Sequence, residues 1–194
     1  MSGFTGLRLD NATIARAQQG DSDATAALFR CFAPAVYTLA LRLCQCASTA
    51  DDLTQETFVA VIQGLSDFRS EASLATWIRK IAVSRCLMHL RSAWQRKASS
   101  IEAFIDDIRA PDTDEQQIND QQRLERALSA LSSQARAVVW LYDVEGYTHR
   151  EIADLMGKSV SFSKSCLSRA HAELRAVLDG EERCEDSQPK RCSL

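Results

Sequence analysis

Cysteines are the residues of this sequence best suited to chemistry. Seven occur among 194 residues, and thiolates act both as nucleophiles and as ligands for soft metals. Cys44 and Cys46, with Cys184 and Cys192 in the polar C-terminal tail, are the candidates for a metal- or oxidation-sensing group. Against this interpretation, small thiols pack well at a helix end, where Cys44 and Cys46 fall, and two tail cysteines eight residues apart do not complete a four-ligand site. We expect no metal and no cofactor.

No catalytic pattern is evident in the sequence. It contains no glycine-rich phosphate loop, no paired histidines at metal-binding spacing and no nucleophile motif. The three histidines, His89, His149 and His171, are scattered. We therefore expect a protein that is not an enzyme and has no catalytic residues.

The sequence also favours a cytoplasmic location. No run of apolar residues approaches the roughly 20 that cross a bilayer, and residues 1–10 lack the charged start and apolar core of a signal peptide. The odd number of cysteines and their irregular spacing do not resemble a disulfide framework, so we expect reduced thiols and no insertion into a membrane.

The net charge of −3 conceals two blocks of opposite sign. Residues 69–97 carry seven cations against the single anion Glu71, whereas residues 102–120 carry seven carboxylates against the single cation Arg109. Nucleic acid responds to local clusters of charge rather than to their sum. The pattern indicates a basic surface followed by an acidic tether.

Apolar residues recur at helical spacing, which predicts an all-α fold. We expect a first domain over residues 10–97, in which Phe29, Ile62 and Trp77 lie on buried faces. Its four helices are expected at Asn11–Gln19 (capped by Asp10 or Asn11), Asp23–Leu43 (bent or interrupted by Pro34), Ala50–Leu65 (capped by Ser48 or Thr49) and about Ser73–Arg96.

An acidic linker is expected over residues 98–118, a second domain over 119–178 and a flexible polar tail over 179–194. The second domain begins with a helix that buries Leu124, Ala127, Leu128 and Leu131. Another helix starts at Ser132 or Ser133 and ends at Gly146. Thr148 then caps His149–Met156 in a capping box with Glu151, Gly157 makes the turn, and a last helix runs from Ser159 or Ser161 to about Leu178. This spacing is typical of a helix-turn-helix DNA reader.

Several ordered stretches resemble bacterial sigma factors of the extracytoplasmic-function class, in the sigma-70 family. They are Asp51-Asp52-Leu53-Thr54-Gln55-Glu56-Thr57-Phe58, Phe68-Arg69-Ser70 through Thr76-Trp77-Ile78, Tyr147-Thr148 through Glu151-Ile152-Ala153, and Lys164-Ser165-Cys166-Leu167-Ser168-Arg169-Ala170. The resemblance covers about residues 10–178. It implies sigma region 2 and sigma region 4 joined by the linker, in a factor that directs core RNA polymerase to particular promoters.

The resemblance assigns polymerase docking to the acidic third helix, at Asp51, Asp52, Gln55 and Glu56. In the family this helix meets the clamp helices of the largest polymerase subunit, and carboxylates paired with arginines there give orientation and association rate. An alternative remains from the residues alone, because acids in a first helical turn also stabilise the helix dipole.

The resemblance also assigns the minus-ten element to the loop Phe68–Thr76 and the basic fourth helix. A protein that opens a promoter holds unpaired bases while cations follow the backbone. Trp77 has the spacing of a core residue, and Ser84 and Met88 stand where the family commonly has Asn and Asp. The implied set is Phe68, Arg69, Trp77, Arg79, Lys80, Ser84, Arg85, Met88 and Arg91, with His89 beside it; Arg91, Arg96 and Lys97 either contact phosphates or solvate the helix end.

The minus-thirty-five element is assigned to the helix-turn-helix, which reads base edges in the major groove. Cys166 replaces an Arg usual in the family, so binding is expected to depend more on Lys158, Lys164 and Arg169. His149 either approaches the DNA backbone or is an ordinary exposed helix residue. The implied set is Thr148, His149, Lys158, Ser161, Phe162, Ser163, Lys164, Ser165, Cys166 and Arg169.

Core RNA polymerase, promoter DNA and an anti-sigma factor are the partners that the resemblance implies, in a stress or envelope response. Two alternatives remain open. One is a sigma factor that senses metal or redox state directly through its cysteines. The other is a helix-turn-helix regulator that binds duplex DNA without polymerase, with residues 10–97 as an effector or dimerisation domain.

Overall fold

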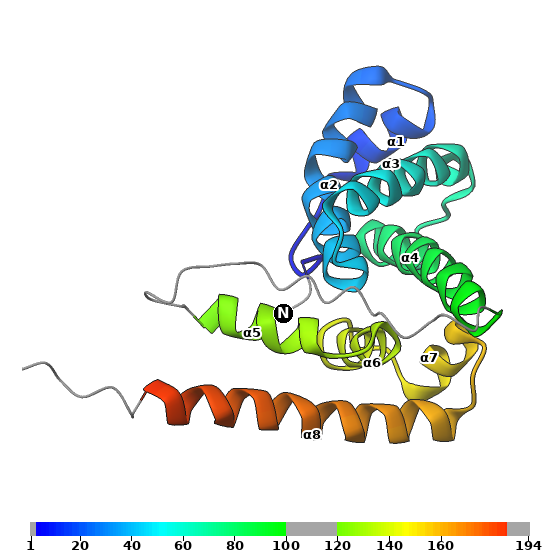
Figure 1. The fold of residues 1–194 in the computed structure, drawn as a ribbon. Helices are drawn as coiled ribbons and strands as arrows, with labels where there is room; N and C mark the ends of the chain where they lie inside the picture. The colour runs from blue at the N-terminus through cyan, green and yellow to red at the C-terminus, as the bar shows by residue number, and fades with distance from the viewer. Residues whose placement is uncertain (1–2, 100–119, 186–194) are drawn as a thin grey trace, which may run out of the picture. The chain divides into compact units, whose positions relative to one another are not determined.

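The protein is described from a computed structural model, in which residues 3–99 and 120–185 are placed. Within these residues the chain forms eight α-helices, two short helical turns and no strand, so the all-α prediction is confirmed. The helices fall into two compact units, α1–α4 and α5–α8 (Figure 1). The expected linker beyond residue 99 and the end of the tail from residue 186 lie outside the described residues.

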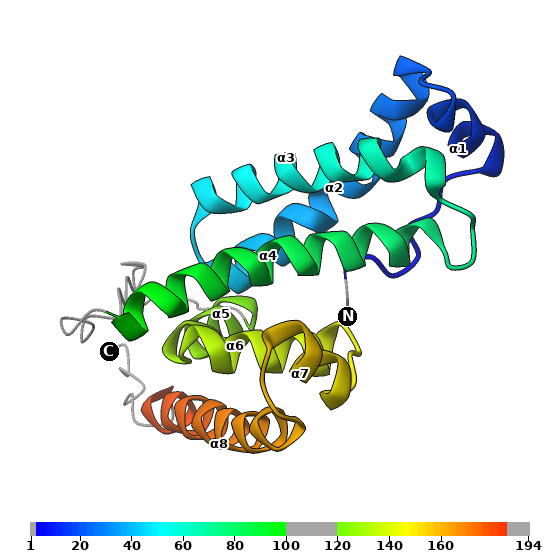
Figure 2. The same cartoon turned by 90° about the vertical axis from the view of Figure 1, so that its right-hand side faces the viewer.

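The first unit is built around α2. It packs against α1, α3 and α4 (Figure 2). Phe32 on α2 is completely buried. The carboxylates of Asp10 and Asp21 cap α1 and α2, accepting from Thr13 N at 2.8 Å and from Ala24 N at 2.9 Å. The elements are α1 (Asn11–Gln18), α2 (Ser22–Cys44), α3 (Ala47–Gly64), η1 (Leu65–Asp67) and α4 (Leu74–Ser99).

One expectation about helix ends in the first unit is wrong. Helix α3 begins at Ala47, earlier than predicted, with Cys46 as its N-cap and no side-chain hydrogen bond from the cap. Of the bend or interruption expected at Pro34, the interruption is absent, because α2 continues through this residue. A proline removes one backbone hydrogen bond, but Phe32 and Val36 on either side of it are buried, and this packing holds the helix together.

Two side chains expected in the core of the first unit are exposed. Phe29 keeps 44% of its accessible surface and Ile62 keeps 52%. Both residues lie at the edge of their apolar stripes, beside Leu28 and Val61, which face the core. The Phe29 ring instead rests on Phe58, with centroids 4.7 Å apart.

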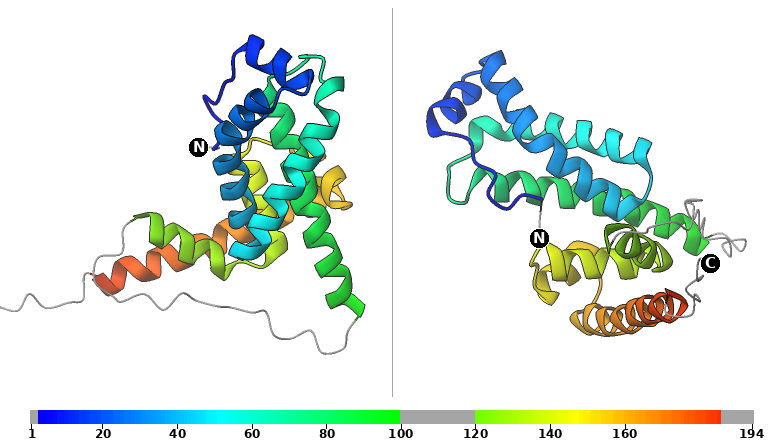
Figure 3. Two further views of the ribbon diagram at one scale, coloured as in Figure 1. Left: turned by 90° about the horizontal axis from the view of Figure 1, so that it is seen from above. Right: turned by 90° about the vertical axis from the view of Figure 1, so that its left-hand side faces the viewer.

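Helix α2 is also long and apolar enough to cross a membrane by length and composition. Much of its apolar side is buried against the neighbouring helices of the first unit, as in the core helix of a folded domain (Figure 3).

The second unit places α5, α6 and α7 along the long helix α8 (Figure 1). The predicted capping box is present, because Thr148 N donates to Glu151 Oε2 at 2.8 Å and Glu151 N donates to Thr148 Oγ1 at 3.3 Å. Gly157 ends α7 in the left-handed conformation, with φ of 64°. The elements are α5 (Asp120–Ala130), α6 (Ser133–Val139), η2 (a π-helical turn, Trp140–Val144), α7 (His149–Met156) and α8 (Val160–Glu185).

Two details of the second unit differ from expectation. Leu124 is half exposed rather than buried, whereas Ala127, Leu128 and Leu131 are in the core. Helix α8 continues to Glu185, beyond the predicted end at Leu178. Its last residues are mostly Glu and Arg, which are polar but are good helix formers, so polarity alone did not mark the end of the helix.

Candidate protein and nucleic-acid interfaces

Four polar residues form an exposed face on α3. Asp51, Asp52, Gln55 and Glu56 are all solvent-exposed. Because α3 begins at Ala47, its first turn holds no acid. Stabilisation by the helix dipole falls off within the first turn, so it does not explain acids at these positions. Their side chains are available to a partner.

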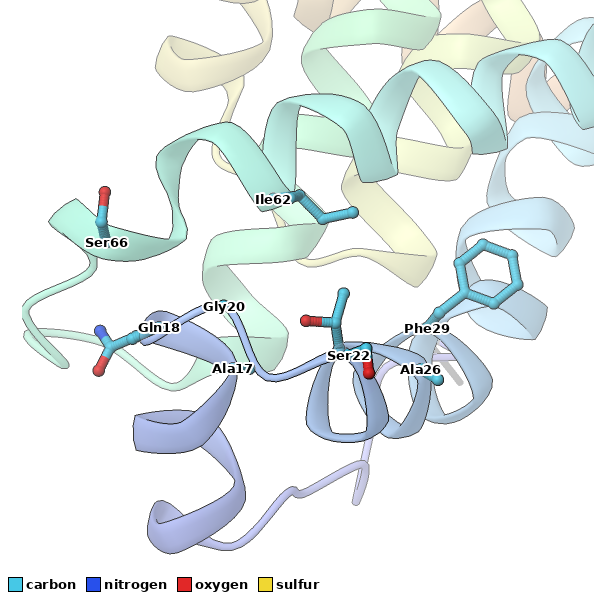
Figure 4. Close-up of a pocket in the computed structure, with 9 residues that line it drawn as sticks. Ala17, Gln18, Gly20, Ser22, Ala26, Phe29, Ile62 and Ser66 are labelled. Carbon is cyan, nitrogen blue, oxygen red and sulfur yellow. The ribbon is translucent and has the colours of Figure 1, made fainter.

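The exposed side of α3 continues as an apolar surface. Val59 and Ile62 follow Asp51 and Gln55 at helical spacing, and both are more than half exposed. Ile62 and Phe29 line an open cavity of about 600 Å³ between α1, α2 and α3, and Ser66 and Gln18 line its other end (Figure 4). Sequence reasoning missed this surface because Phe29 and Ile62 were expected in the core.

One side of α4 carries the residues expected to meet nucleic acid. Lys80, Ser84, Met88 and Arg91 are exposed and follow one another at steps of four, four and three residues, which aligns them along the helix. The remaining basic candidates differ in exposure: Arg69, His89 and Arg96 are exposed, whereas Arg79 and Arg85 are half-buried. The side chain of Lys97 lies outside the described residues.

Trp77 is a packing residue at the start of α4. It is half-buried, and its ring contacts Phe68 with centroids 5.2 Å apart and planes tilted by 41°. The ring also lies against Gly64, where an added Cβ would be 3.3 Å from Trp77 Cζ2. The spacing that predicted an inward Trp77 agrees with this placement. Phe68 and Trp77 together form the base of the loop 68–73.

Two residues assigned to the DNA-reading face of the second unit are buried instead. Ser163 keeps 1% of its accessible surface and Cys166 keeps 6%. Ser163 Oγ lies 3.0 Å from His149 Nδ1, and the His149 ring stacks on Tyr142 with centroids 4.5 Å apart. His149 is therefore half-buried and joins α7 to α8 and η2 within the unit. The hydroxyl of Thr148 is likewise used in the cap of α7.

The exposed side of α8 near its start keeps a smaller set of candidates. Ser161, Lys164, Ser165 and Arg169 are all exposed there; Lys164 and Ser165 follow Ser161 by three and four residues, and Arg169 follows Ser165 by four. Phe162 is half-buried, and Lys158 Nζ lies 5.6 Å from the centre of its ring, which holds this cation at the turn before the helix. The backbone N–H of Phe162 donates to Ser159 Oγ at 3.1 Å, so Ser159 caps α8.

Comparison with known proteins agrees with this arrangement. Residues 28–96 match the family Sigma-70 region 2, and residues 121–174 match Sigma-70, region 4. The chain belongs to the sigma-70 family of RNA polymerase sigma factors. It is 29% identical over 178 residues to the ECF RNA polymerase sigma factor SigM of Mycobacterium tuberculosis, covering 91% of this chain and 89% of SigM. It is 30% identical to the RNA polymerase sigma factor YlaC of Bacillus subtilis, covering 66% of this chain and 76% of YlaC.

Solved structures share the fold of this sigma factor. The sigma factor RpoE of Bartonella quintana, in complex with the anti-sigma factor NepR, superposes with a TM-score of 0.55 at 23% identity, covering 79% of this chain and 96% of RpoE. CnrH, in complex with the cytosolic domain of CnrY, superposes with a TM-score of 0.52 at 24% identity, covering 88% of this chain and 97% of CnrH. The protein is thus an initiation factor of the extracytoplasmic-function class, which binds core polymerase and promoter DNA and is not an enzyme.

The described cysteines of this sigma factor differ in their environments. Cys86 is buried in α4, and a hydrogen bond with the Cys44 thiol, followed by burial, raises the pKa of its own thiol. Cys31 is half-buried, and burial raises the pKa of its thiol too. Cys46 is exposed, contrary to the expectation that it packs at the end of α2. Among the residues that the structure describes, no three His, Cys, Asp or Glu side chains gather as metal ligands.

Cys46 has the properties of a reactive thiol. It precedes α3, and the Ser48 hydroxyl lies 3.2 Å from its sulfur. Hydrogen bonds from the Ser48 hydroxyl, then from the Thr49 side chain and amide, lower the pKa of the Cys46 thiol to about 7. Such hydrogen bonds favour the charged form of the group. The thiolate therefore dominates above this pKa and is lost as the pH falls below it.

Among the cysteines with described side chains, Cys46 is predicted to be the first that iodoacetamide modifies, with a rate that reaches half of its maximum near the pKa of about 7. Peptide mapping by mass spectrometry across pH 5–9 measures this rate. Ser48→Ala removes the largest cause of the shift, so its midpoint should move toward the ordinary value of 9.0. Cys31 is the internal control. A Cys46 midpoint no lower than that of Cys31 would contradict the assignment.

Proposed function

We propose that this sigma factor docks on the clamp helices of core RNA polymerase through α3. The observation that carries the proposal is the exposed alignment of Asp51, Asp52, Gln55 and Glu56. Basic side chains of a partner can pair with these carboxylates, and the adjacent apolar surface at Val59 and Ile62 supplies area that can be buried on binding. The acids select the partner and orient it, while apolar burial adds affinity.

The side of α4 with Lys80, Ser84, Met88 and Arg91 captures the melted minus-ten DNA. Its two cations follow the phosphates, and the loop 68–73 receives a base extruded from the stack. Ser84 and Met88 lie in the centre of this alignment, where the family commonly has Asn and Asp. A hydroxyl and a thioether offer different hydrogen bonds from an amide and a carboxylate, so this factor prefers a minus-ten sequence of its own.

The minus-thirty-five element is read by the start of α8. Ser161, Lys164, Ser165 and Arg169 face the major groove, and Lys158 contacts phosphate at the turn. Because Ser163 and Cys166 are buried, they are left out of this contact set. The position of the Arg usual in the family thus carries a packing residue, and fewer cations of α8 reach the DNA.

Lys164→Ala is predicted to weaken promoter binding and to lower the slope of log K against log salt by about 1, since one phosphate contact is lost. Fluorescence anisotropy of the holoenzyme on a duplex minus-thirty-five fragment at several salt concentrations measures both quantities. Arg175→Ala is the matched control, because Arg175 is an exposed cation further along α8. If Lys164→Ala keeps the wild-type slope, Lys164 does not contact the DNA.

An anti-sigma factor is the regulator that we propose for this chain. RpoE and CnrH, which share its fold, were solved in complexes with NepR and with CnrY. A partner that covers α3 or the basic side of α4 would block polymerase or promoter binding. The proposed setting is a stress or envelope response in the cytoplasm, where polymerase and reduced thiols are found.

The test of the proposed function is run-off transcription with purified core polymerase on a library of genomic fragments, with and without this protein. New 5′ ends that share elements at minus ten and minus thirty-five are the expected result, and they supply the promoter sequence. A folded protein that produces no new starts, while binding duplex DNA alone, would instead favour a regulator that acts without polymerase.

A further inference from the structure

A single amide from α1 holds the turn that leads into the loop 68–73. Gln18 Nε2 donates to Leu65 O at 3.1 Å and to Phe68 O at 3.0 Å. An amide nitrogen carries two hydrogens, so both are used, and two carbonyl acceptors settle which end of the amide faces them. The two acceptors are the first residue of η1 and the residue that follows its end, 47 and 50 positions along the chain from Gln18. Figure 4 shows Gln18 at the end of α1 and Ser66 in η1.

The base of the loop is held from α4 as well. Trp77 contacts both the Phe68 ring and Gly64, as described above. At the far end of the loop, Thr76 N donates to Ser73 Oγ at 3.1 Å, and the two hydroxyls lie 2.8 Å apart. The two ends of the loop 68–73 are therefore held in place, by Gln18 and Trp77 at the Phe68 end and by the Ser73–Thr76 hydrogen bonds at the other.

The residues between these ends are exposed and partly strained. Arg69, Ser70, Glu71 and Ala72 all face solvent. Ser70 has φ of 58°, a left-handed conformation that is unfavourable for a residue with a Cβ. Such a conformation persists where the surrounding structure determines it, and it is often found at ligand-binding sites. The loop thus has a preset shape and accessible polar groups.

We infer that Gln18 is a positioning residue for base capture: it presets the loop 68–73 in the shape that receives the extruded minus-ten base, without contacting DNA. This inference rests on the proposed function of the loop. Preorganisation raises affinity because the ordering of the loop occurs during folding rather than during binding. Loss of the Gln18 hydrogen bonds should therefore reduce what the captured base contributes to the affinity for DNA. What the phosphates contribute to this affinity should be unchanged.

Gln18→Met is the main variant, because methionine has a similar length and no donor. Gln18→Glu is a second variant, which keeps a polar side chain but sets a carboxylate against two carbonyl oxygens. Gln19→Met is the matched control, since Gln19 is the adjacent exposed glutamine at the end of α1. Thermal unfolding of each full-length variant establishes that it is folded.

The probe is a single-stranded oligonucleotide with the non-template minus-ten sequence of a start mapped by run-off transcription. The Kd of the holoenzyme is measured for the intact oligonucleotide and for a series of oligonucleotides that each carry one abasic site, at a different position of the element. The ratio of the abasic to the intact Kd reports what each base contributes. At the captured base the wild type should give a ratio of about 5 or more, since a held base contributes at least this much.

Gln18→Met is expected to bring this ratio at the captured base toward 1 and to leave the Kd of the abasic probe unchanged. Gln18→Glu should do the same, and Gln19→Met should behave as the wild type. A wild-type ratio in Gln18→Met would overturn the inference while leaving base capture intact. An equal loss on both probes, or loss of cooperative unfolding in both Gln18 variants, would assign Gln18 to the fold alone. Wild-type ratios near 1 at every position would instead overturn the proposed role of the loop.

Discussion

Reversing the charge of Asp52 and Glu56 together, as Asp52→Lys/Glu56→Lys, should weaken binding to core RNA polymerase by about 30-fold or more. The estimate follows from the roughly 2–5 kcal/mol by which loss of one partner weakens a desolvated, hydrogen-bonded charge pair. Both residues are exposed on α3, so the folded state should be unaffected. Titration of labelled core polymerase, followed by fluorescence anisotropy, measures the change in Kd.

The matched control for this experiment is Asp23→Lys/Asp154→Lys. Asp23 on α2 and Asp154 on α7 are also exposed acids, so the control changes the net charge by the same amount. A general effect of charge would weaken both double variants equally. If the Asp52/Glu56 variant binds polymerase as the wild type does, while remaining folded, the docking face lies elsewhere on the protein.

Phe32→Ala should destabilise the first unit by about 3–5 kcal/mol, the usual result of removing a phenyl ring from a core. Phe32 is completely buried at the centre of α2. A typical domain has a free energy of unfolding of about 5–15 kcal/mol, so this loss should remove a substantial part of the stability of the unit. Urea unfolding followed by tryptophan fluorescence, in a Trp140→Phe background, measures the free energy of unfolding of the first unit. The remaining tryptophans, Trp77 and Trp94, both lie in α4 and report on this unit alone.

Phe29→Ala is the control within the same helix. Phe29 is one turn away and 44% exposed, so its loss should cost about 1 kcal/mol, mainly from the ring contact with Phe58. Equal destabilisation by the two variants would show that Phe29 is as much a core residue as Phe32. A large effect of Phe29→Ala on polymerase binding, without an effect on stability, would add Phe29 to the docking surface.

The candidate sites could be predicted from sequence where exposure follows from helical periodicity. Asp51, Asp52, Gln55 and Glu56 are exposed as expected, because they alternate with the apolar residues that hold α3 on the core. Periodicity was less informative at the edges of the apolar stripes. It placed Phe29 and Ile62 inside, and in α8 it did not separate the buried Ser163 and Cys166 from their exposed neighbours. A residue at such an edge is buried or exposed according to what packs beside it.

The sequence by itself determined the family, the order of the helices and most of their caps, because these depend on residues close together in the chain. Asp10, Ser132 and Thr148 each accept from an amide three positions away, and such a bond forms wherever the local sequence permits it. Only the tertiary structure decided that Gln18 holds the turn before the loop 68–73 and that His149 is used within its unit by Ser163 and Tyr142. The physical reason is that these contacts join helices whose approach depends on the packing of the whole unit, for which the local sequence carries no signal.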